Sequence, residues 1–371
     1  MKKLLIDINT IIPYYTKHYA TGIGRSTLEL LKALSKIEAI PFKIILFSQN
    51  MRGIKAKKDF SFSCLHFYMP NRPFFKKLSS ILRLKRVFCN YDLLHMPNNT
   101  DVVENEKKVI YTIHDLAVCR YPQMWGVENN PRFFQQLRAS LQNCKAIITC
   151  SECSKRDIIA FAHVPQEKVI SIPWGINRTV FRPASTPNFV KQLGLPSLYY
   201  FSASCNHPRK NLPILLLAFR EYLEKGGLGV LVLLNPIETD LIRAADLIET
   251  KKIIICRNIS DKDLAELYTF AHCSILVSEY EGFGFPILES LACHTMVLSS
   301  QNSSLKEVGG AVCDYIKQIT PTAICDKLLY YDKMDKKEIL NIDELESHLK
   351  QFTWDKCASE YVKFYQKQLN I

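Results

Sequence analysis

SEYEGFGFPILES (residues 278–290) begins at the last residue of CSILVS (Cys273–Ser278), a segment with the length and composition of a buried strand. A turn containing Gly282 and Gly284 then leads into an amphipathic helix, in which Pro286 is expected at the first position. A buried strand, a glycine turn and a helix in this order are typical of a parallel α/β sheet. Helix N-termini bind anions, and glycines let a ligand approach the backbone. The carboxyl edge of this sheet is therefore a candidate site for a phosphorylated or polyhydroxylated ligand.

Two glutamates flank the turn: Glu281 precedes it, and Glu289 lies one turn into the helix. On spacing alone they have two interpretations. They could belong to a ligand site, or they could be solvated carboxylates in the strand–turn–helix unit that every α/β protein contains.

The bulk composition fits two ordinary α/β domains. A length of 371 residues is too great for one typical core, and 47% hydrophobic with 23% charged residues is usual for a globular protein. Thirteen cysteines are scattered singly, and the one C-x-x-C motif, Cys150–Cys153, has no second pair, so we expect reduced, structural thiols. The apolar N-terminal run ends at Asp7, and no segment reaches the roughly 18 apolar residues of a membrane span, which predicts a cytoplasmic protein.

Positive charge is concentrated in the first half of the chain. Residues 1–182 contain 28 Lys and Arg against 13 Asp and Glu, a net charge of +15, and residues 183–371 carry −3. A basic half favours a partner with anionic groups. The sequence has no zinc finger, RNP-like aromatic strand or basic zipper, so we expect no nucleic-acid partner and favour anionic lipid or a lipid-diphosphate acceptor.

One basic segment has two interpretations. In NRPFFKKLSSILRLKRVF (residues 71–88), cations alternate with apolar residues as in a helix that lies on an anionic membrane surface. A core-packed helix with a basic outer face would show the same pattern. The cations that would meet the membrane or acceptor are Lys76, Lys77, Arg83, Lys85 and Arg86.

Both halves alternate apolar segments with helical patterns, as parallel α/β domains do. In the first half, His114 and Asp115 follow the apolar segment VIYTI at the end where such folds place their chemistry, and Ser151 is a plausible helix N-cap. In the second half, Arg209 and Lys210 lie side by side where a loop becomes a helix. They could bind a diphosphate or form an ordinary surface pair. Expected strands are 2–9, 42–48, 63–69, 91–97, 109–113, 146–149, 228–235, 251–258 and 273–278.

The string EGFGFPILE (281–289) resembles the Glu-x7-Glu signature of retaining GT-B glycosyltransferases, in the mannosyltransferase-like branch of the large nucleotide-sugar-dependent family 4 (glycosyl transferases group 1). The resemblance runs from about residue 1 to the end of the chain. Further segments similar to motifs of this family are GIGR (22–25), IHDL (113–116), PRKN (208–211), SSLKEV (303–308) and the C-terminal helix FTWDKCASEYVKFYQKQL (352–369).

The resemblance implies the GT-B fold: two Rossmann-like, doubly wound α/β domains that face a cleft, with a C-terminal helix crossing back to the first. We place the acceptor-side domain at residues 1–180 plus 355–371, and the nucleotide-sugar domain at residues 181–354.

The resemblance also implies roles for individual residues. Glu281 would grip the sugar hydroxyls, His114 would contact the donor sugar, and Arg209 and Lys210 would stabilise the departing diphosphate. Two side-chain cations replace a metal ion, so the family pattern implies no metal and no other cofactor. Donor-binding roles, at the ribose, sugar, nucleobase or phosphates, fall on Glu289, Gly282, Phe283, Gly284, Phe285, Asn258, Ile259, Gly24 and Ser304.

The chain departs from the family pattern in three places. Cys205 stands where many members carry the first phosphate-binding arginine, so Arg209 must replace that contact or the contact is missing. Arg257 replaces a glycine of the base-binding segment, and Lys306 stands where proline is usual. The first two departures leave the phosphate contacts and the base preference open.

The implied activity is retaining transfer of a hexose to a saccharide acceptor in bacterial surface polysaccharide biosynthesis, and the resemblance implies that this acceptor is lipid-linked. GDP-mannose is the favoured donor, with UDP-sugars or a rhamnosyl donor as alternatives. The implied location is the cytoplasm, with peripheral attachment to the inner face of the cell membrane. A non-catalytic sugar-nucleotide-binding subunit, a GT-B epimerase and a Rossmann oxidoreductase remain as alternatives of other classes.

Overall fold

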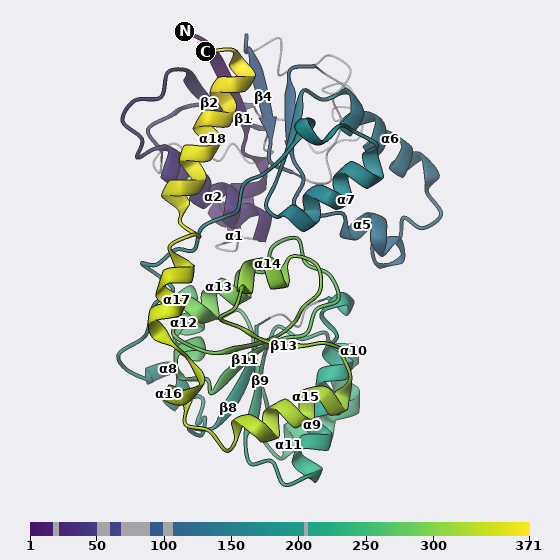
Figure 1. The fold of residues 1–371 in the computed structure, drawn as a ribbon, viewed down its shortest axis with the longest axis vertical. Coiled ribbons are helices and arrows are strands. Elements are labelled where there is room, and N and C mark those ends of the chain that lie inside the picture. The colour runs from purple at the N-terminus through teal and green to yellow at the C-terminus, as the bar shows by residue number, and fades with distance from the viewer. Residues whose placement is uncertain (18–21, 50–59, 68–89, 99–106, 204–206) are drawn as a thin grey trace. The chain divides into compact units, whose positions relative to one another are not determined.

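The computed structural model describes residues 1–17, 22–49, 60–67, 90–98, 107–203 and 207–371. The chain forms two compact units (Figure 1). The first comprises Met1–Gly175 together with Trp354–Ile371, and the second comprises Ile176–Thr353.

The described residues of the first unit form a seven-stranded sheet in the order β3-β2-β1-β4-β5-β6-β7, in which all neighbouring strands are parallel. Strands β4, β5 and β6 are buried along their whole length, as expected for a parallel sheet covered on both faces. The strands are β1 (Lys3–Asp7), β2 (Lys43–Gln49), β3 (Ser63–Phe67), β4 (Leu93–Met96), β5 (Val109–Thr112), β6 (Ala146–Thr149) and β7 (Val169–Ser171).

Helices follow these strands, and two of them begin with side-chain caps. The side chain of Asn130 accepts from the backbone N–H of Phe133, and Ser151 accepts from Ser154 N–H at 3.1 Å, which confirms the predicted Ser151 cap. The helices of this unit are α1 (Ile12–Lys17), α2 (Gly22–Leu34), α5 (Ala117–Arg120), α6 (Pro131–Asn143), α7 (Glu152–Ala162) and α18 (Trp354–Leu369), with 3-10 turns at Asn9–Ile11, Pro122–Trp125 and Gln166–Lys168.

In the described part of the second unit, six parallel strands are ordered β10-β9-β8-β11-β12-β13. They are β8 (Tyr199–Ser202), β9 (Val230–Leu234), β10 (Ile253–Cys256), β11 (Cys273–Leu276), β12 (Val297–Ser300) and β13 (Asp314–Ile316). The helices are α8 (Asn188–Gln192), α9 (Leu212–Glu224), α10 (Glu238–Leu241), α11 (Ala245–Glu249), α12 (Asp261–Phe270), α13 (Phe285–Ala292), α14 (Leu305–Gly309), α15 (Pro321–Tyr331), α16 (Lys336–Ile339) and α17 (Ile342–Leu349), with 3-10 turns η4 (Pro208–Lys210) and η5 (Ile242–Ala244).

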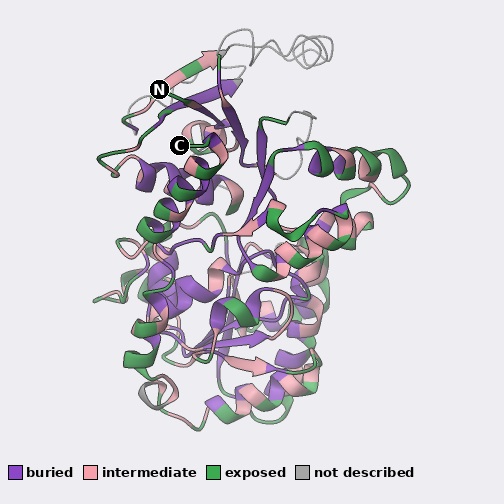
Figure 2. Cartoon of the chain, turned by 45° about the horizontal axis from the view of Figure 1, so that its top comes forward, coloured by how far each residue is buried: buried purple, intermediate pink, exposed green. Residues whose placement is uncertain are grey.

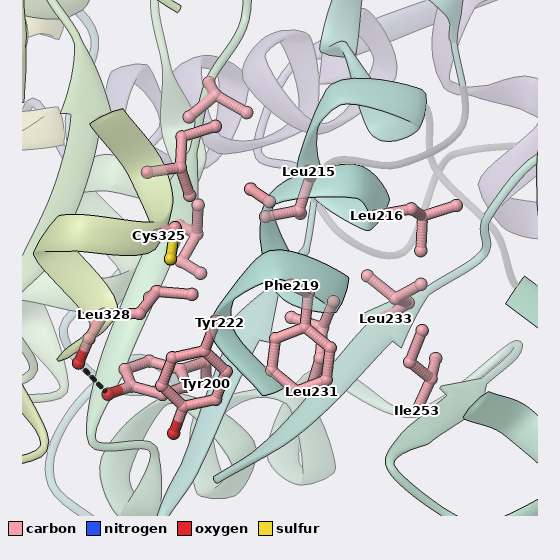
Figure 3. Close-up of a cluster of buried hydrophobic side chains, with 14 of the residues drawn as sticks. Tyr200, Leu215, Leu216, Phe219, Tyr222, Leu231, Leu233, Ile253, Cys325 and Leu328 are labelled. Carbon is pink, nitrogen blue, oxygen red and sulfur yellow. Dashed lines mark hydrogen bonds between the residues drawn. The ribbon is translucent and has the colours of Figure 1, made fainter. Parts of the chain in front are cut away.

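The core of the second unit is closed by α9 and α15, which pack side by side against the sheet. Phe219 of α9 lies over Leu231 of β9, and Leu328 of α15 borders the same cluster (Figure 3). The hydroxyl of Tyr200 donates to the carbonyl of Leu328 at 2.9 Å, so a buried polar atom on β8 has a partner inside the core. In both units the central strands are buried and the outer helix faces are exposed (Figure 2), whereas the edge strand β3 is exposed or half-buried. Two parallel doubly wound units confirm the predicted fold class.

The C-terminal helix α18 packs on the first unit, where it contacts α2. Its Tyr365 hydroxyl lies 2.8 Å from Nδ1 of His95 on β4, and Nε2 of His95 lies 2.7 Å from Oγ1 of Thr112 on β5. Burial, followed by repulsion from His114, lowers the pKa of His95 to about 3, so its imidazole is neutral at pH 7. A neutral imidazole offers one donor and one acceptor, and this chain of contacts uses both nitrogens.

Tyr365→Phe should therefore destabilise the first unit. The substitution keeps the ring but leaves one nitrogen of the buried His95 without its partner, which costs about 1–3 kcal/mol. Urea unfolding would measure the loss. Tyr330→Phe is the matched control, because Tyr330 is 53% exposed, and its unfolding midpoint should not change.

Two sequence predictions differ from the structure in detail, and others lie outside the residues that it describes. Gly22 and Gly24 lie inside the first turn of α2 rather than before it; burial of Gly24 and Leu28 fixes this turn despite the weak helix propensity of glycine. Pro286 occupies the second position of α13, because Phe285 is already helical after Gly284. The predicted basic helix at 71–88, with Lys76, Lys77, Arg83, Lys85 and Arg86, lies outside the described residues, and so does Cys205.

Candidate active site

The residues predicted to bind the donor's diphosphate and sugar meet at the carboxyl edge of the second sheet. Strands β8 and β11 are neighbours although they are separated in sequence, and the strand order reverses between them. Such a topological switch point is where open α/β sheets bind ligands. The turn η4 follows β8, and Glu281 with the glycine turn follows β11.

Glu281 accepts hydrogen bonds from three side chains. Nη1 of Arg209 lies 2.9 Å from its Oε2, Lys210 Nζ pairs with its Oε1, and Ser278 Oγ lies 2.9 Å from the same Oε1. The side chains of Lys210 and Glu281 are only 8% and 9% exposed. Because water and salt screen a buried pair less than an exposed one, these charges act on each other more strongly than they would at the surface.

The PRKN segment directs both cations at the same carboxylate. After η4, Asn211 adopts a left-handed backbone conformation with φ of 57°, which asparagine tolerates better than most residues. Its side-chain amide donates to the carbonyl of Val277 at 3.0 Å, and the carbonyl of Arg209 accepts from Glu279 N–H at 2.9 Å. These bonds hold the segment after β8 against the segment after β11.

The cluster keeps Glu281 ionised. Burial by itself would raise the pKa of this carboxyl, but attraction by Lys210 and Arg209 and hydrogen bonds from Lys210 and Ser278 outweigh burial and lower the pKa to about 2. At neutral pH the two cations and one carboxylate therefore carry a net charge of +1.

Two serines hold the glycine turn. Oγ of Ser304 lies 2.8 Å from the carbonyl oxygen of Glu281 and 2.7 Å from that of Phe283, so its one proton is shared between them, and the N–H of Glu281 donates to Oγ of Ser303 at 2.8 Å. Gly284 has φ of 115°, and a Cβ there would lie 3.0 Å from a methyl group of Leu305. Only glycine fits this position without strain, so the turn has a defined shape.

Glu289 and the segment after β10 occupy the same edge of the sheet. Glu289 is 4% exposed on α13 and accepts from the Tyr268 hydroxyl at 3.1 Å. Asn258 is exposed, with φ of 52°, and its N–H donates to Oδ1 of Asn235 at 3.2 Å; Ile259 follows it half-buried. The exposed Arg257 forms an ion pair with Glu238 at 2.6 Å, so it points its charge along the surface of its own unit.

In the first unit, His114 follows β5 and is 5% exposed. Its Nε2 lies 3.4 Å from the carbonyl of Pro97, and its ring packs on Trp174 with centroids 5.1 Å apart. Burial lowers its pKa to about 4, so it is neutral at pH 7 and acts as a hydrogen-bonding group rather than a charge. Gly24 is buried in the first turn of α2.

Sequence reasoning missed Ser278, Ser303 and Tyr268, which support the two glutamates. A serine at the end of an apolar strand is the one available signal for Ser278. Nothing in the local pattern points to Tyr268, since its position 21 residues before Glu289 becomes meaningful only in the folded sheet.

Some properties concern the described part of the chain as a whole. Its eleven cysteines form no disulfide bond with one another, and it contains no group of three or more His, Cys, Asp or Glu side chains arranged to hold a metal ion. Among the helices that the structure describes, none is both long enough and apolar enough to cross a membrane.

Known proteins resemble this chain along nearly its whole length. Residues 20–180 match a family model described as Glycosyltransferase Family 4, and residues 194–312 match one described as Glycosyl transferases group 1. The O-antigen chain mannosyltransferase B of Escherichia coli is 25% identical over 370 residues, which cover 94% of this chain and 97% of that protein.

Solved structures support the same assignment at the level of the fold. The sucrose-phosphate synthase of Thermosynechococcus elongatus superposes with a TM-score of 0.76 at 16% identity and full coverage of both chains. HepE of Anabaena, solved with UDP and glucose, gives a TM-score of 0.75 at 13% identity, covering 99% of this chain and 100% of that one. Given the GT-B fold and the two family models that match consecutive parts of it, the chain belongs to the family 4 (group 1) glycosyltransferases.

Proposed function

We propose that this glycosyltransferase moves a hexose from a nucleotide-diphosphate sugar to a saccharide acceptor with retention of anomeric configuration, and that GDP-mannose is its donor. The observation that carries the proposal is the buried cluster of Arg209, Lys210 and Glu281 at the switch point of the second unit. A cluster of two fixed cations and one carboxylate, with a net charge of +1, suits a departing diphosphate, whose negative charge grows in the transition state.

In this reaction the bond between the sugar and the diphosphate breaks while the acceptor hydroxyl attacks from the same face. Arg209 and Lys210 stabilise the charge left on the diphosphate, whose oxygen takes the proton of the attacking hydroxyl. Glu281 orients both cations, and its one remaining lone-pair site, on Oε2, accepts from a sugar hydroxyl beside the backbone of residues 282–285. No covalent enzyme intermediate is required.

The other predicted residues complete the proposed donor site. Glu289 binds the ribose hydroxyls, and the backbone of Asn258 and Ile259 contacts the nucleobase. His114 contacts the donor sugar as a neutral imidazole. Gly24 and Ser304 contribute to the phosphate site. Gly24 lets the phosphates approach the backbone because it has no side chain, and Ser304 fixes the glycine turn.

Because side-chain cations neutralise the leaving group, we propose that neither a metal ion nor another cofactor is needed. Activity after dialysis against EDTA should equal activity in Mg²⁺, and restoration of a lost activity by metal would contradict this. The anomeric configuration of the product, determined by NMR, tests retention.

The name of the E. coli relative supports a mannosyl donor and an O-antigen-type acceptor, whereas the UDP and glucose in the HepE structure support a UDP-sugar as the second candidate. A thermal-shift screen with GDP, GDP-mannose, UDP and UDP-glucose separates them, because a ligand that binds only the folded state raises Tm. A protein that binds a nucleotide sugar but neither hydrolyses nor transfers it would instead be a non-catalytic subunit.

We further propose that the acceptor is lipid-linked and that the basic segment 71–88 attaches the protein to the inner face of the cell membrane. Flotation with anionic vesicles tests this: reversing the charges of Lys76, Lys77, Arg83 and Arg86 should abolish binding. The matched control reverses four exposed lysines of the second unit and should leave flotation unchanged; these are Lys191, Lys251, Lys262 and Lys306. Equal flotation of all three proteins would refute the proposal.

A further inference from the structure

The glycine turn is packed against the point where the chain leaves the second unit. Phe283, in the turn, is 3% exposed, and its ring meets that of Phe352 edge-on with centroids 6.1 Å apart. Phe352 is 7% exposed and lies one residue before Thr353, the last residue of this unit. A buried edge-on pair is stabilising beyond the area that it covers, so the position of Phe352 restricts that of Phe283.

The second crossing of the chain is tied to the same residue. Ile176 is the first residue of the second unit, and its N–H donates to the carbonyl of Phe352 at 3.0 Å. Two residues later, Arg178 forms an ion pair with Glu346 of α17 at 2.7 Å. The two points at which the chain passes between the units, before Ile176 and after Thr353, are therefore joined by a hydrogen bond inside the second unit.

Contacts with α17 also restrict the position of the Phe352 ring. Its ring packs on His348 of α17 with centroids 5.2 Å apart, and Nε2 of His348 lies 2.8 Å from the carbonyl of Val308 on α14. A Cβ on Gly310 would lie 2.7 Å from the His348 ring, at a φ of 56°. Since Ser304, at the start of α14, also holds the carbonyl of Phe283, the turn, α14 and α17 form one continuous set of contacts around Phe352.

We propose that Phe352 is a positioning residue for sugar binding. Through Phe352, binding of a sugar at the glycine turn is coupled to the hydrogen bond between Ile176 and Phe352, where the two chain crossings meet. The inference rests on the proposed function, in which residues 281–285 bind the sugar while Glu289 and Lys210 bind the nucleotide part. Coupling of this kind is reciprocal. If the position of Phe352 changes the affinity for the sugar, binding of the sugar must stabilise the hydrogen bond between Ile176 and Phe352 to the same degree.

The first test separates the sugar from the nucleotide. In Phe352→Leu, affinity for GDP should stay within about twofold of wild type, while affinity for GDP-mannose should fall about tenfold, the size of a lost aromatic contact. UDP and UDP-glucose are measured in the same way. Phe219→Leu is the matched control, since Phe219 is a fully buried phenylalanine of the same unit in the core around α9; it should lower stability and leave both affinities unchanged. Equal weakening of both ligands in Phe352→Leu, or the same pattern in the control, would overturn the proposal.

The second test uses the wild-type chain and does not depend on a variant folding. Hydrogen exchange at the amide of Ile176 should slow more with the nucleotide sugar than with the nucleotide alone, because only the sugar occupies the turn. The difference should disappear in Phe352→Leu. Identical protection by both ligands would refute the coupling while leaving the proposed function intact. A wild-type protein that binds none of the four probes would overturn the proposed function, and this inference with it.

Discussion

Replacing Lys210 with alanine is expected to lower kcat about 10²-fold or more, with a much smaller effect on KM for the donor. The reason is that Lys210 opposes a negative charge that is greatest in the transition state, when the diphosphate has separated from the sugar. Its ammonium is buried beside Glu281, so neither water nor salt can replace it effectively. Initial rates of sugar transfer, over a range of donor concentrations, measure both constants.

Lys225→Ala is the control for this experiment. Lys225 lies at the end of α9 in the same unit, is 45% exposed and forms a surface ion pair with Glu221 at 2.8 Å. Surface pairs contribute little to stability, and this one is not part of the site, so kcat should remain at the wild-type value. A Lys210→Ala enzyme with wild-type turnover would remove Lys210 from the reaction.

Much of the fold was predictable because buried parallel strands are continuous apolar runs. VIYT and AIIT became β5 and β6, and the apolar segment at 273–278 contains β11. The termini of elements were less predictable, since they depend on tertiary contacts. The first turn of α2, for example, contains two glycines that local propensity would place outside a helix.

The contacts of the candidate site could not be derived from spacing. Arg209 and Glu281 are 72 residues apart, and they meet because β8 and β11 are neighbours in the sheet, a fact that no local pattern contains. Resemblance to the family identified Arg209 and Glu281 separately as site residues, but it did not predict that they contact each other. For Ser304, the hydroxyl is directed at the carbonyls of Glu281 and Phe283, a contact that depends on how α14 packs on the turn.

Glu281→Ala is expected to impair both turnover and stability. Turnover should fall about 10²-fold or more, because the cations lose the group that orients them and the sugar loses an acceptor. Stability should fall by about 3–5 kcal/mol, because breaking a buried pair leaves the charge of Lys210 without compensation. Urea unfolding and initial rates measure the two effects. Glu279→Ala, two residues earlier and exposed, should change neither.

The two effects can be separated by removing both charges and by lowering the pH. In Glu281→Ala/Lys210→Met no lone buried ammonium remains, so much of the stability should return while turnover stays low; a double variant as unstable as Glu281→Ala would contradict the ion-pair explanation. The folded-state pKa of Glu281, about 2, lies below its ordinary value of 4.5. Its contribution to stability is therefore complete above pH 4.5 and is lost as the pH falls toward 2. The stability difference between wild type and Glu281→Gln should shrink across that interval, and a difference independent of pH would show that the carboxylate charge does not stabilise the fold.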